Sequence, residues 1–125
     1  MTVLLDASAV LAFLQGERGA RVIRPLLGES LVLSVNWSEV LQKITNRSDR
    51  PAGEVAAMLV AVGVEVEPLW RGDAERAAEL WTAWPHLSLA DRCCLAAAER
   101  LDVRVYTADS EWASLDSSVQ VELIR

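Results

Sequence analysis

The chain has 125 residues, 52% of them hydrophobic and 24% charged, which is the composition of one folded domain over residues 1–125 and excludes a disordered tail. A formal net charge of −6 excludes a protein that holds nucleic acid on a broad basic surface, so any such contact has to be local. No apolar stretch approaches the roughly 20 residues that cross a bilayer, and we expect a cytoplasmic protein with no membrane partner.

Short apolar runs alternate along the chain with stretches of helical periodicity. In chain order they predict a strand at 2–5, helices at 7–14 and 18–27, a strand at 31–33, helices from 35 or 36 to about 46–49 and from 51 to 62, a strand at 64–67, helices at 73–84 and 89–101, and strands at 103–107 and 119–124. Pro25 should kink or end the second helix, and Pro51 occupies a favoured first-turn position. Strands alternating with helices imply an α/β fold with a parallel sheet covered on both faces.

Four acidic residues fall where such a sheet would present its carboxyl edge. Asp6 ends the first strand, and Asp109 follows the strand at 103–107 by one alanine. Glu39 and Asp91 each lie in the first turn of a predicted helix that could enter from the same edge. Because ligands of open α/β sheets bind beyond the carboxyl ends of the strands, we expect the four carboxylates to converge.

Carboxylate oxygens are ligands that suit Mg²⁺ or Mn²⁺, small hard cations that keep several waters and also bind substrate phosphate. Such a cation can polarise a phosphoryl oxygen, lower the pKa of a bound water and steady the leaving oxygen, so no protein nucleophile is needed. Without metal the clustered carboxylates should repel one another, which raises the pKa of at least one. Metal binding should therefore stabilise the fold.

Each acid also has a purely structural explanation. Residues 36–39 and 88–91 both have the spacing of a capping box, in which the acid serves the start of its helix. Asp6 could cap the helix that begins near Ser8, and Asp109 could sit in an ordinary turn after a strand. The acidic balance fits a surface that docks on a basic partner as well as a metal site. Pattern alone leaves these alternatives open.

Four short segments, in this order, resemble motifs of the PIN-domain ribonucleases, and most closely those of the VapC toxins of prokaryotic toxin–antitoxin pairs. They are Leu5-Asp6-Ala7-Ser8-Ala9, Asn36-Trp37-Ser38-Glu39-Val40, Leu87-Ser88-Leu89-Ala90-Asp91-Arg92 and Tyr106-Thr107-Ala108-Asp109-Ser110-Glu111-Trp112. Each motif is weak by itself, and the signal comes from finding all four in the right order. The likeness spans essentially the whole chain.

This resemblance implies a PIN-like three-layer α/β/α sandwich around a mainly parallel sheet of about five strands. It also implies Mg²⁺ or Mn²⁺ as cofactor, endonucleolytic cleavage of RNA, frequent homodimers and a cognate antitoxin protein that inhibits the nuclease. By position, Asp6 and Asp91 match the most direct metal ligands, while Glu39 and Asp109 match acids that complete the site through waters or a second ion.

Two hydroxyls and three basic residues join the candidate site. Ser8 and Thr107 match positions that often orient the carboxylates, although capping and strand hydroxyls explain them too. Lys43, Arg47 and Arg50 lie on or just after the Glu39 helix and are candidate RNA contacts; a solvated helix end explains them equally well. The tryptophans should mostly be core residues, with one or two at a dimer or antitoxin interface. The adjacent Cys93 and Cys94 indicate small buried hydrophobic residues, not a disulfide.

Three other readings remain beside the nuclease. A receiver-like signalling domain also binds Mg²⁺ at strand ends, but it needs a lysine after a late strand, and the only lysine is Lys43. A haloacid-dehalogenase-type phosphatase needs an aspartate two residues beyond Asp6, where Ser8 stands. A catalytically inactive PIN-fold binding module is the third, and retention of all four acids argues against it.

Overall fold

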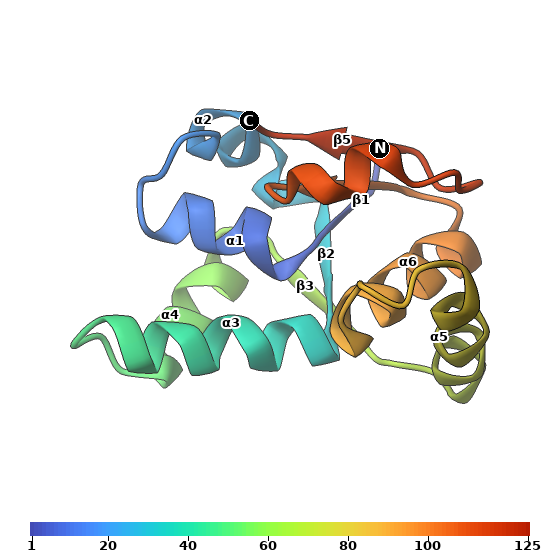
Figure 1. Cartoon of the computed structure of the whole chain (residues 1–125). Coiled ribbons are helices and arrows are strands. Elements are labelled where there is room, and N and C mark those ends of the chain that lie inside the picture. The colour runs from blue at the N-terminus through green and yellow to red at the C-terminus, as the bar shows by residue number, and fades with distance from the viewer.

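A five-stranded sheet lies at the centre of the computed structural model, which describes residues 1–125 (Figure 1). The strand order is β3-β2-β1-β4-β5, and every neighbouring pair is parallel. The strands are β1 (Val3–Leu5), β2 (Ser30–Leu33), β3 (Glu65–Glu67), β4 (Arg104–Thr107) and β5 (Val121–Leu123). Each lies within the predicted run or extends it by one residue, so the predicted α/β class is confirmed.

Six α-helices and two 3₁₀ helices connect the strands. They are α1 (Ala7–Leu14), α2 (Ala20–Ile23), η1 (Arg24–Glu29), α3 (Ser34–Arg47), α4 (Ala52–Ala61), α5 (Arg71–Ala83), α6 (Leu89–Leu101) and η2 (Ser110–Ser114). Pro25 explains why the helix predicted at 18–27 divides, since proline lacks the N–H that continues an α-helix. Pro51 caps α4 instead of occupying its first turn. Gly63, with φ of 108°, adopts the left-handed backbone that favours glycine and follows the end of α4.

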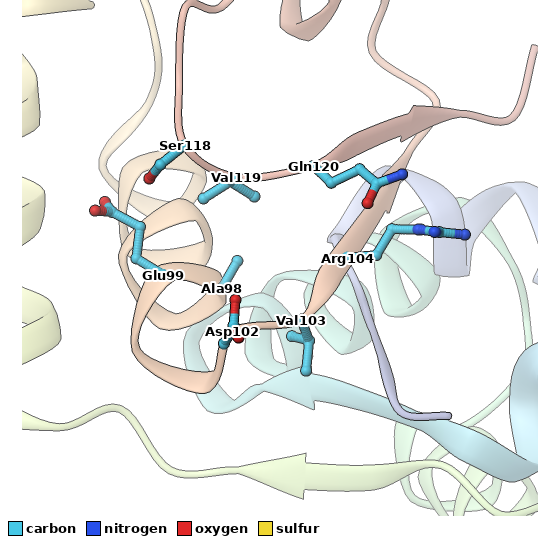
Figure 2. Close-up of a pocket in the computed structure, with 8 residues that line it drawn as sticks. All are labelled: Ala98, Glu99, Asp102, Val103, Arg104, Ser118, Val119 and Gln120. Carbon is cyan, nitrogen blue, oxygen red and sulfur yellow. The ribbon is translucent and has the colours of Figure 1, made fainter.

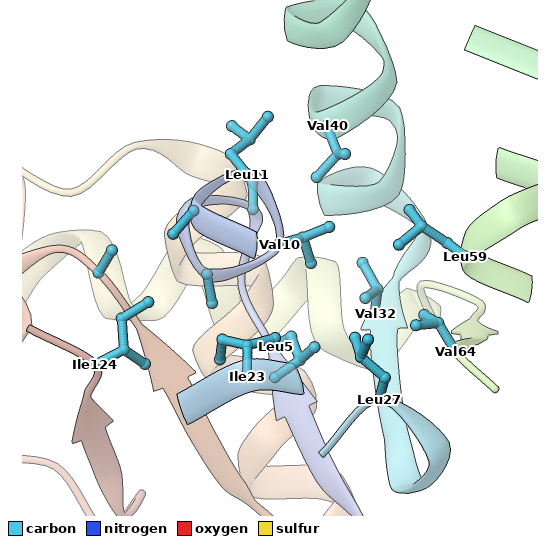
Figure 3. Close-up of a cluster of buried hydrophobic side chains, with 14 of the residues drawn as sticks. Leu5, Val10, Leu11, Ile23, Leu27, Val32, Val40, Leu59, Val64 and Ile124 are labelled. Carbon is cyan, nitrogen blue, oxygen red and sulfur yellow. The ribbon is translucent and has the colours of Figure 1, made fainter. Parts of the chain in front are cut away.

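Alternation along the strands divides the core into two layers. Val3 and Leu5 of β1 point to the face that α1, α3 and α4 cover, where they meet Val10, Val40 and Leu59 (Figure 3). Figure 1 shows those helices on one side of the sheet and α5 with α6 on the other. Both faces are therefore buried, and the predicted three-layer α/β/α sandwich is confirmed.

The second layer depends on small side chains of α6. Leu4 of β1 faces this side, where the buried face of α6 carries cysteine and alanine residues. Cys93 and Cys94 are free and buried, as predicted for small hydrophobic residues. Because these side chains are short, α6 lies close to the sheet, and Leu80 of α5 packs against the same cluster.

Three of the five tryptophans lie in or against the core and two are exposed, which agrees with the prediction that most are core residues. Trp112 is fully buried, and Trp37 and Trp84 pack against the two core clusters with part of their surface exposed. Trp70 and Trp81 are each 56% exposed. No helix of the structure has the length and apolar character needed to cross a membrane.

The strand order fixes where a ligand could bind. The chain leaves β1 for α1 on one face of the sheet, whereas it reaches β4 from α6 on the other face. The direction of winding therefore changes between the neighbouring strands β1 and β4. In parallel α/β sheets the crevice beyond the carboxyl ends of such a strand pair is the usual ligand site. Asp6 and Asp109 follow these two strands.

Candidate metal-binding active site

Asp6 is the most deeply buried of the four acids, with 3% of its surface exposed. It caps α1, as predicted, because its Oδ1 accepts a hydrogen bond of 2.9 Å from the Ala9 amide. Ser8 Oγ donates to the same oxygen at 2.8 Å, and Thr107 Oγ1 donates to Oδ2 at 2.5 Å. Burial raises the pKa of Asp6 to about 6; the three hydrogen bonds act against this rise, and the charge of Asp91 adds to it.

The two hydroxyls that hold Asp6 also tie the ends of β1 and β4 together. Thr107 Oγ1 lies 3.2 Å from Ser8 Oγ, and it accepts a hydrogen bond of 3.0 Å from the Asp109 amide. Ser8 Oγ in turn accepts a hydrogen bond of 2.9 Å from the Ala108 amide. The position of Asp109 is thus linked to that of Asp6 through side-chain hydroxyls.

Asp109 lies in the turn after β4 and caps η2. Its Oδ1 accepts a hydrogen bond of 2.9 Å from the Glu111 amide, which leaves Oδ2 without a partner in the protein. Trp112, one turn later, is buried and donates its backbone N–H to the Asp109 carbonyl at 3.2 Å. The ordinary turn role is therefore present, and it occupies only one of the two carboxylate oxygens.

Asp91 stands in the first turn of α6, where it forms the predicted capping box with Ser88. The Asp91 amide donates to Ser88 Oγ at 3.1 Å, and the Ser88 amide donates to Asp91 Oδ2 at 3.4 Å. Burial raises the pKa of Asp91, and the charges of Glu39 and Asp109 raise it further. Oδ1 makes no hydrogen bond within the protein.

Glu39 occupies a different helical position from the predicted one. α3 begins at Ser34, directly after β2, so Glu39 lies in the second turn and the capping box predicted for residues 36–39 is wrong. No loop separates strand from helix, and Leu33 is the residue before the first turn. Glu39 Oε2 accepts from Lys43 Nζ at 3.2 Å, whereas Oε1 is buried without a hydrogen-bond partner.

Asn36, which belongs to the capping-box spacing and to one of the family motifs, has a further structural role at this site. Its side chain is fully buried, and Nδ2 donates to the Ala90 carbonyl of α6 at 3.4 Å, next to Asp91. Its Oδ1 is buried with no partner. Asn36 precedes the buried Val40 by four residues, so it lies on the apolar stripe of α3. A polar residue on that stripe was the signal that could have revealed it.

The pKa of the Cys94 thiol also reflects the proximity of the acids. The pKa of its buried thiol is raised well above the ordinary value, first by burial and then by the charges of Asp6, Asp91 and Glu39. Asp109 joins this set through its effect on the pKa of Asp91. The fold therefore brings four acids from four separate segments into one electrostatically coupled group.

No three acidic, histidine or cysteine side chains stand close enough together to ligate one metal ion. A Mg²⁺ ion held through one or two carboxylates, waters and substrate phosphate would not need such a cluster. The donors also fit: all four are hard carboxylate oxygens, and Glu39 Oε1 is buried without a partner.

The four acids line none of the hollows in the surface. One hollow, of about 370 Å³, lies where α6 ends and β4 and β5 begin, with Arg104 and Gln120 at its rim (Figure 2). It contains no residue of the candidate site.

The three candidate RNA contacts follow the acids along α3. Lys43 pairs with Glu39, one turn away. Arg47 Nη1 donates a hydrogen bond of 3.5 Å to Gln15 Oε1, at the end of α1. Arg50 is exposed in the turn after α3, and no carboxylate lies within ion-pair distance of it. His86 is exposed before α6 and makes no side-chain hydrogen bond.

A model of the PIN domain family matches residues 3–118, so the chain belongs to this family. Solved structures agree in fold. A toxin–antitoxin complex from Klebsiella pneumoniae has a chain that is 17% identical, with a TM-score of 0.79 over 99% of this chain and 98% of that one. No curated protein sequence matches the chain significantly.

Two further structures show the same fold. VapC20 of Mycobacterium tuberculosis, described as a sarcin-ricin loop cleaving toxin, is 17% identical, with a TM-score of 0.75 over 90% of this chain and 94% of that one. A chain of the DNA-bound VapBC complex of Salmonella typhimurium is 13% identical, with a TM-score of 0.77 over 100% and 99% of the two chains. Identity at this level establishes the shared architecture.

Proposed function

We propose that this chain is a Mg²⁺- or Mn²⁺-dependent endoribonuclease and the toxin of a type II toxin–antitoxin pair. The observation that carries the proposal is the coupling of Asp91 to the other three acids: Glu39 and Asp109 raise its pKa, and Asp91 in turn raises that of Asp6. Acids that share one electrostatic environment at a sheet edge favour a cation site over four unrelated helix caps.

Asp6 and Asp91 would hold the cation most directly, with Glu39 and Asp109 completing the site through waters or a second ion. A divalent cation bound there lowers the pKa of water and neutralises charge on the phosphoryl oxygens. Ser8 and Thr107 keep the Asp6 carboxylate in one orientation, since between them they donate to both of its oxygens. Their hydrogen bonds also favour the ionised form that binds metal.

Two carboxylate oxygens without a hydrogen-bond partner could serve as acceptors for an attacking water. Glu39 Oε1 and Asp109 Oδ2 accept no hydrogen bond from the protein and are available to orient an attacking water. Lys43, Arg47 and Arg50 would receive phosphates on the α3 side of the site.

The partners we propose are an RNA substrate, a cognate antitoxin and a second copy of the chain. The similar chains come from proteins described as a toxin–antitoxin complex and as a toxin that cleaves the sarcin-ricin loop, which supports this assignment. A receiver-like domain is disfavoured because the only lysine, Lys43, lies on α3 and pairs with Glu39.

The decisive experiment is cleavage of a total-RNA pool by purified, antitoxin-free protein with Mg²⁺ or Mn²⁺, compared with EDTA. Asp6→Asn and Asp91→Asn should abolish the cuts, whereas Asp116→Asn, a matched change at an exposed aspartate, should leave them intact. Binding of Mn²⁺, measured by calorimetry, should weaken in the first two variants only. Cleavage that survives both substitutions would contradict the proposed role of the acids, and metal-loaded protein that cuts nothing would support the inactive binding module instead.

A further inference from the structure

The basic side chains without an acidic partner are concentrated in one part of the molecule. The chain has 12 lysine and arginine residues. Lys43, Arg71, Arg76, Arg100, Arg104 and Arg125 form ion pairs. Arg92 donates to two backbone carbonyls. The remaining five are Arg18, Arg21, Arg24, Arg47 and Arg50.

These five arginines lie at the same end of the helical layer. α1 and α3 lie side by side with their C-terminal ends pointing the same way (Figure 1). Gln15 ends α1 and accepts the hydrogen bond from Arg47 of α3. The chain then passes from Gln15 through Arg18 into α2 and η1, which carry the other arginines of the group. All five are exposed.

Three of them line a groove of about 520 Å³. Arg18, Arg21 and Arg24 form its wall together with Gly16, Glu17 and Ile124. Glu17, its only acid, faces Arg125 at 3.8 Å, and the Arg125 guanidinium also donates to the Arg18 carbonyl at 3.3 Å. Near Arg50 the sequence also carries the acids Asp49 and Glu54. The groove therefore keeps a positive excess in a chain of net charge −6.

α3 connects the groove to the acidic site. Glu39, Lys43 and Arg47 follow one another at four-residue spacing on one face of the helix, over about 12 Å. Lys43 contacts Glu39 at one end of this row, and Arg47 contacts Gln15 at the other. A strand bound across the acids thus meets cations at each helical turn on its way to the groove.

We propose that this groove, lined by Arg18, Arg21 and Arg24, binds phosphates of the RNA strand at a distance from the cleaved bond. The inference rests on the proposed function. Guanidinium groups present a planar fork that matches phosphate oxygens, and single-stranded RNA follows positively charged grooves. The lining also includes three hydrophobic residues, Ala20, Val22 and Ile124, so it is the excess of three arginines over one acid that favours a phosphate backbone as the occupant.

The test uses Asp91→Asn protein, so that RNA stays intact, and compares two double charge reversals. Arg21→Glu with Arg24→Glu alters the groove, and Arg71→Glu with Arg76→Glu makes the same charge change on α5, across the sheet. Binding of a labelled single-stranded RNA of about 16 nucleotides is followed by fluorescence anisotropy over a series of salt concentrations.

The groove variant should bind this RNA at least about tenfold more weakly, and the slope of log K against log salt should fall by about 1.4, or 0.7 for each lost phosphate contact. An RNA of about four nucleotides should bind equally to both variants. Equal loss in both variants with the longer RNA would overturn the proposal. So would normal RNA binding combined with lost binding of a polyglutamate peptide, which would assign the groove to an acidic protein. Because the assay needs no cleavage, it stays informative if the nuclease assignment fails.

Discussion

Thr107 Oγ1 donates a hydrogen bond of 2.5 Å to Asp6 Oδ2, although 101 residues separate the two in the chain. This contact is the largest of the three that oppose the effect of burial on the pKa of Asp6. It also sets the orientation of a carboxylate that we propose as a metal ligand, and such supporting contacts typically contribute a factor of 10 to 100 in affinity or activity.

Thr107→Val removes the hydroxyl and keeps the shape of the side chain. We expect the pKa of Asp6 to rise further above its ordinary value, because burial then acts with less opposition. Mn²⁺ affinity and RNA cleavage should fall by about tenfold or more, with the larger loss at pH 6 than at pH 8. Thr45→Val, on the exposed side of α3, is the matched control, since Thr45 bonds only the Leu41 carbonyl. An unchanged pH profile would argue against this role of Thr107.

Burial of Asp6 predicts how stability depends on pH in the metal-free protein. Its pKa is 3.8 when unperturbed and about 6 in the fold, so the folded state binds the proton more tightly. The free energy of unfolding therefore decreases as pH rises from about 4 to about 6, by at most about 3 kcal/mol for this one group. The raised pKa of Asp91 acts in the same direction.

Asp6→Asn should remove most of that pH dependence and, in EDTA, make the protein more stable than wild type at pH 8. Urea unfolding at pH 4.5 and pH 8 measures the effect. Saturating Mg²⁺ should reverse the order at pH 8, because only the wild-type carboxylate gains from the cation. The idea would be abandoned if the variant and the wild type lost equal stability between the two pH values.

Asn36 offers a prediction about the packing of α3 against α6. Asn36→Ala removes the donor to the Ala90 carbonyl and leaves space in a fully buried position, so we expect a loss of about 1–3 kcal/mol. Asn46→Ala, at an exposed position of the same helix, should change stability by less than about 0.5 kcal/mol. Chemical denaturation compares the two, and equal effects would contradict the structural role of Asn36.

We expect the loss of the Arg100 side chain to reduce stability without reducing RNA cleavage. It forms a two-pronged ion pair with Asp73, which is only 2% exposed, at 2.8 and 2.9 Å, and its guanidinium stacks 3.9 Å from the Trp70 ring. Burial alone would raise the pKa of Asp73, but the bonds from Arg100 lower it overall. Arg100→Met therefore leaves a buried carboxylate unpaired and should cost about 3 kcal/mol near pH 7.

Adding Asp73→Asn should recover part of that loss, and a double-mutant cycle on unfolding free energies measures the coupling. Because the pKa of Asp73 is lowered in the fold, the stabilisation by Arg100 is present above about pH 4 and is lost as the pH falls below it. Metal-dependent RNA cleavage per folded molecule should stay at the wild-type level. Additive effects of the two substitutions would show that the pair contributes little.

The strands and most helices were predictable because their signals are local. Alternating or β-branched apolar runs mark all five strands, and α6 was predicted to the residue from its alanine-rich, glycine-free sequence. The start of α3 was predicted at 35 or 36, one or two residues after its observed start at Ser34. The hydrogen bond from Asn36 to the Ala90 carbonyl of α6 could not be predicted, because 54 residues separate the two in the chain.

In the candidate site, too, features with a local sequence signal were predictable and contacts between distant segments were not. Its acids could be assigned to the sheet edge because strand ends are visible in the sequence, and the Ser88–Asp91 capping box could be predicted from spacing alone. The hydroxyl link between Ser8 and Thr107 could not, since it depends on the pairing of β1 with β4. Which tryptophans would be exposed, namely Trp70 and Trp81, could not be predicted either, because composition does not show which face of a helix stays uncovered.

The pairing of β1 with β4 affects when the protein can become active. β1 is the first strand to be synthesised, and it lies between β2 and a strand that begins at Arg104. Asp6 therefore gains its contact with Thr107 only when residues that follow it by 101 positions have been synthesised. A fragment that stops before β4 carries Asp6, Glu39 and Asp91 without the strand that unites them. The proposed active site therefore cannot assemble before β4 has been synthesised.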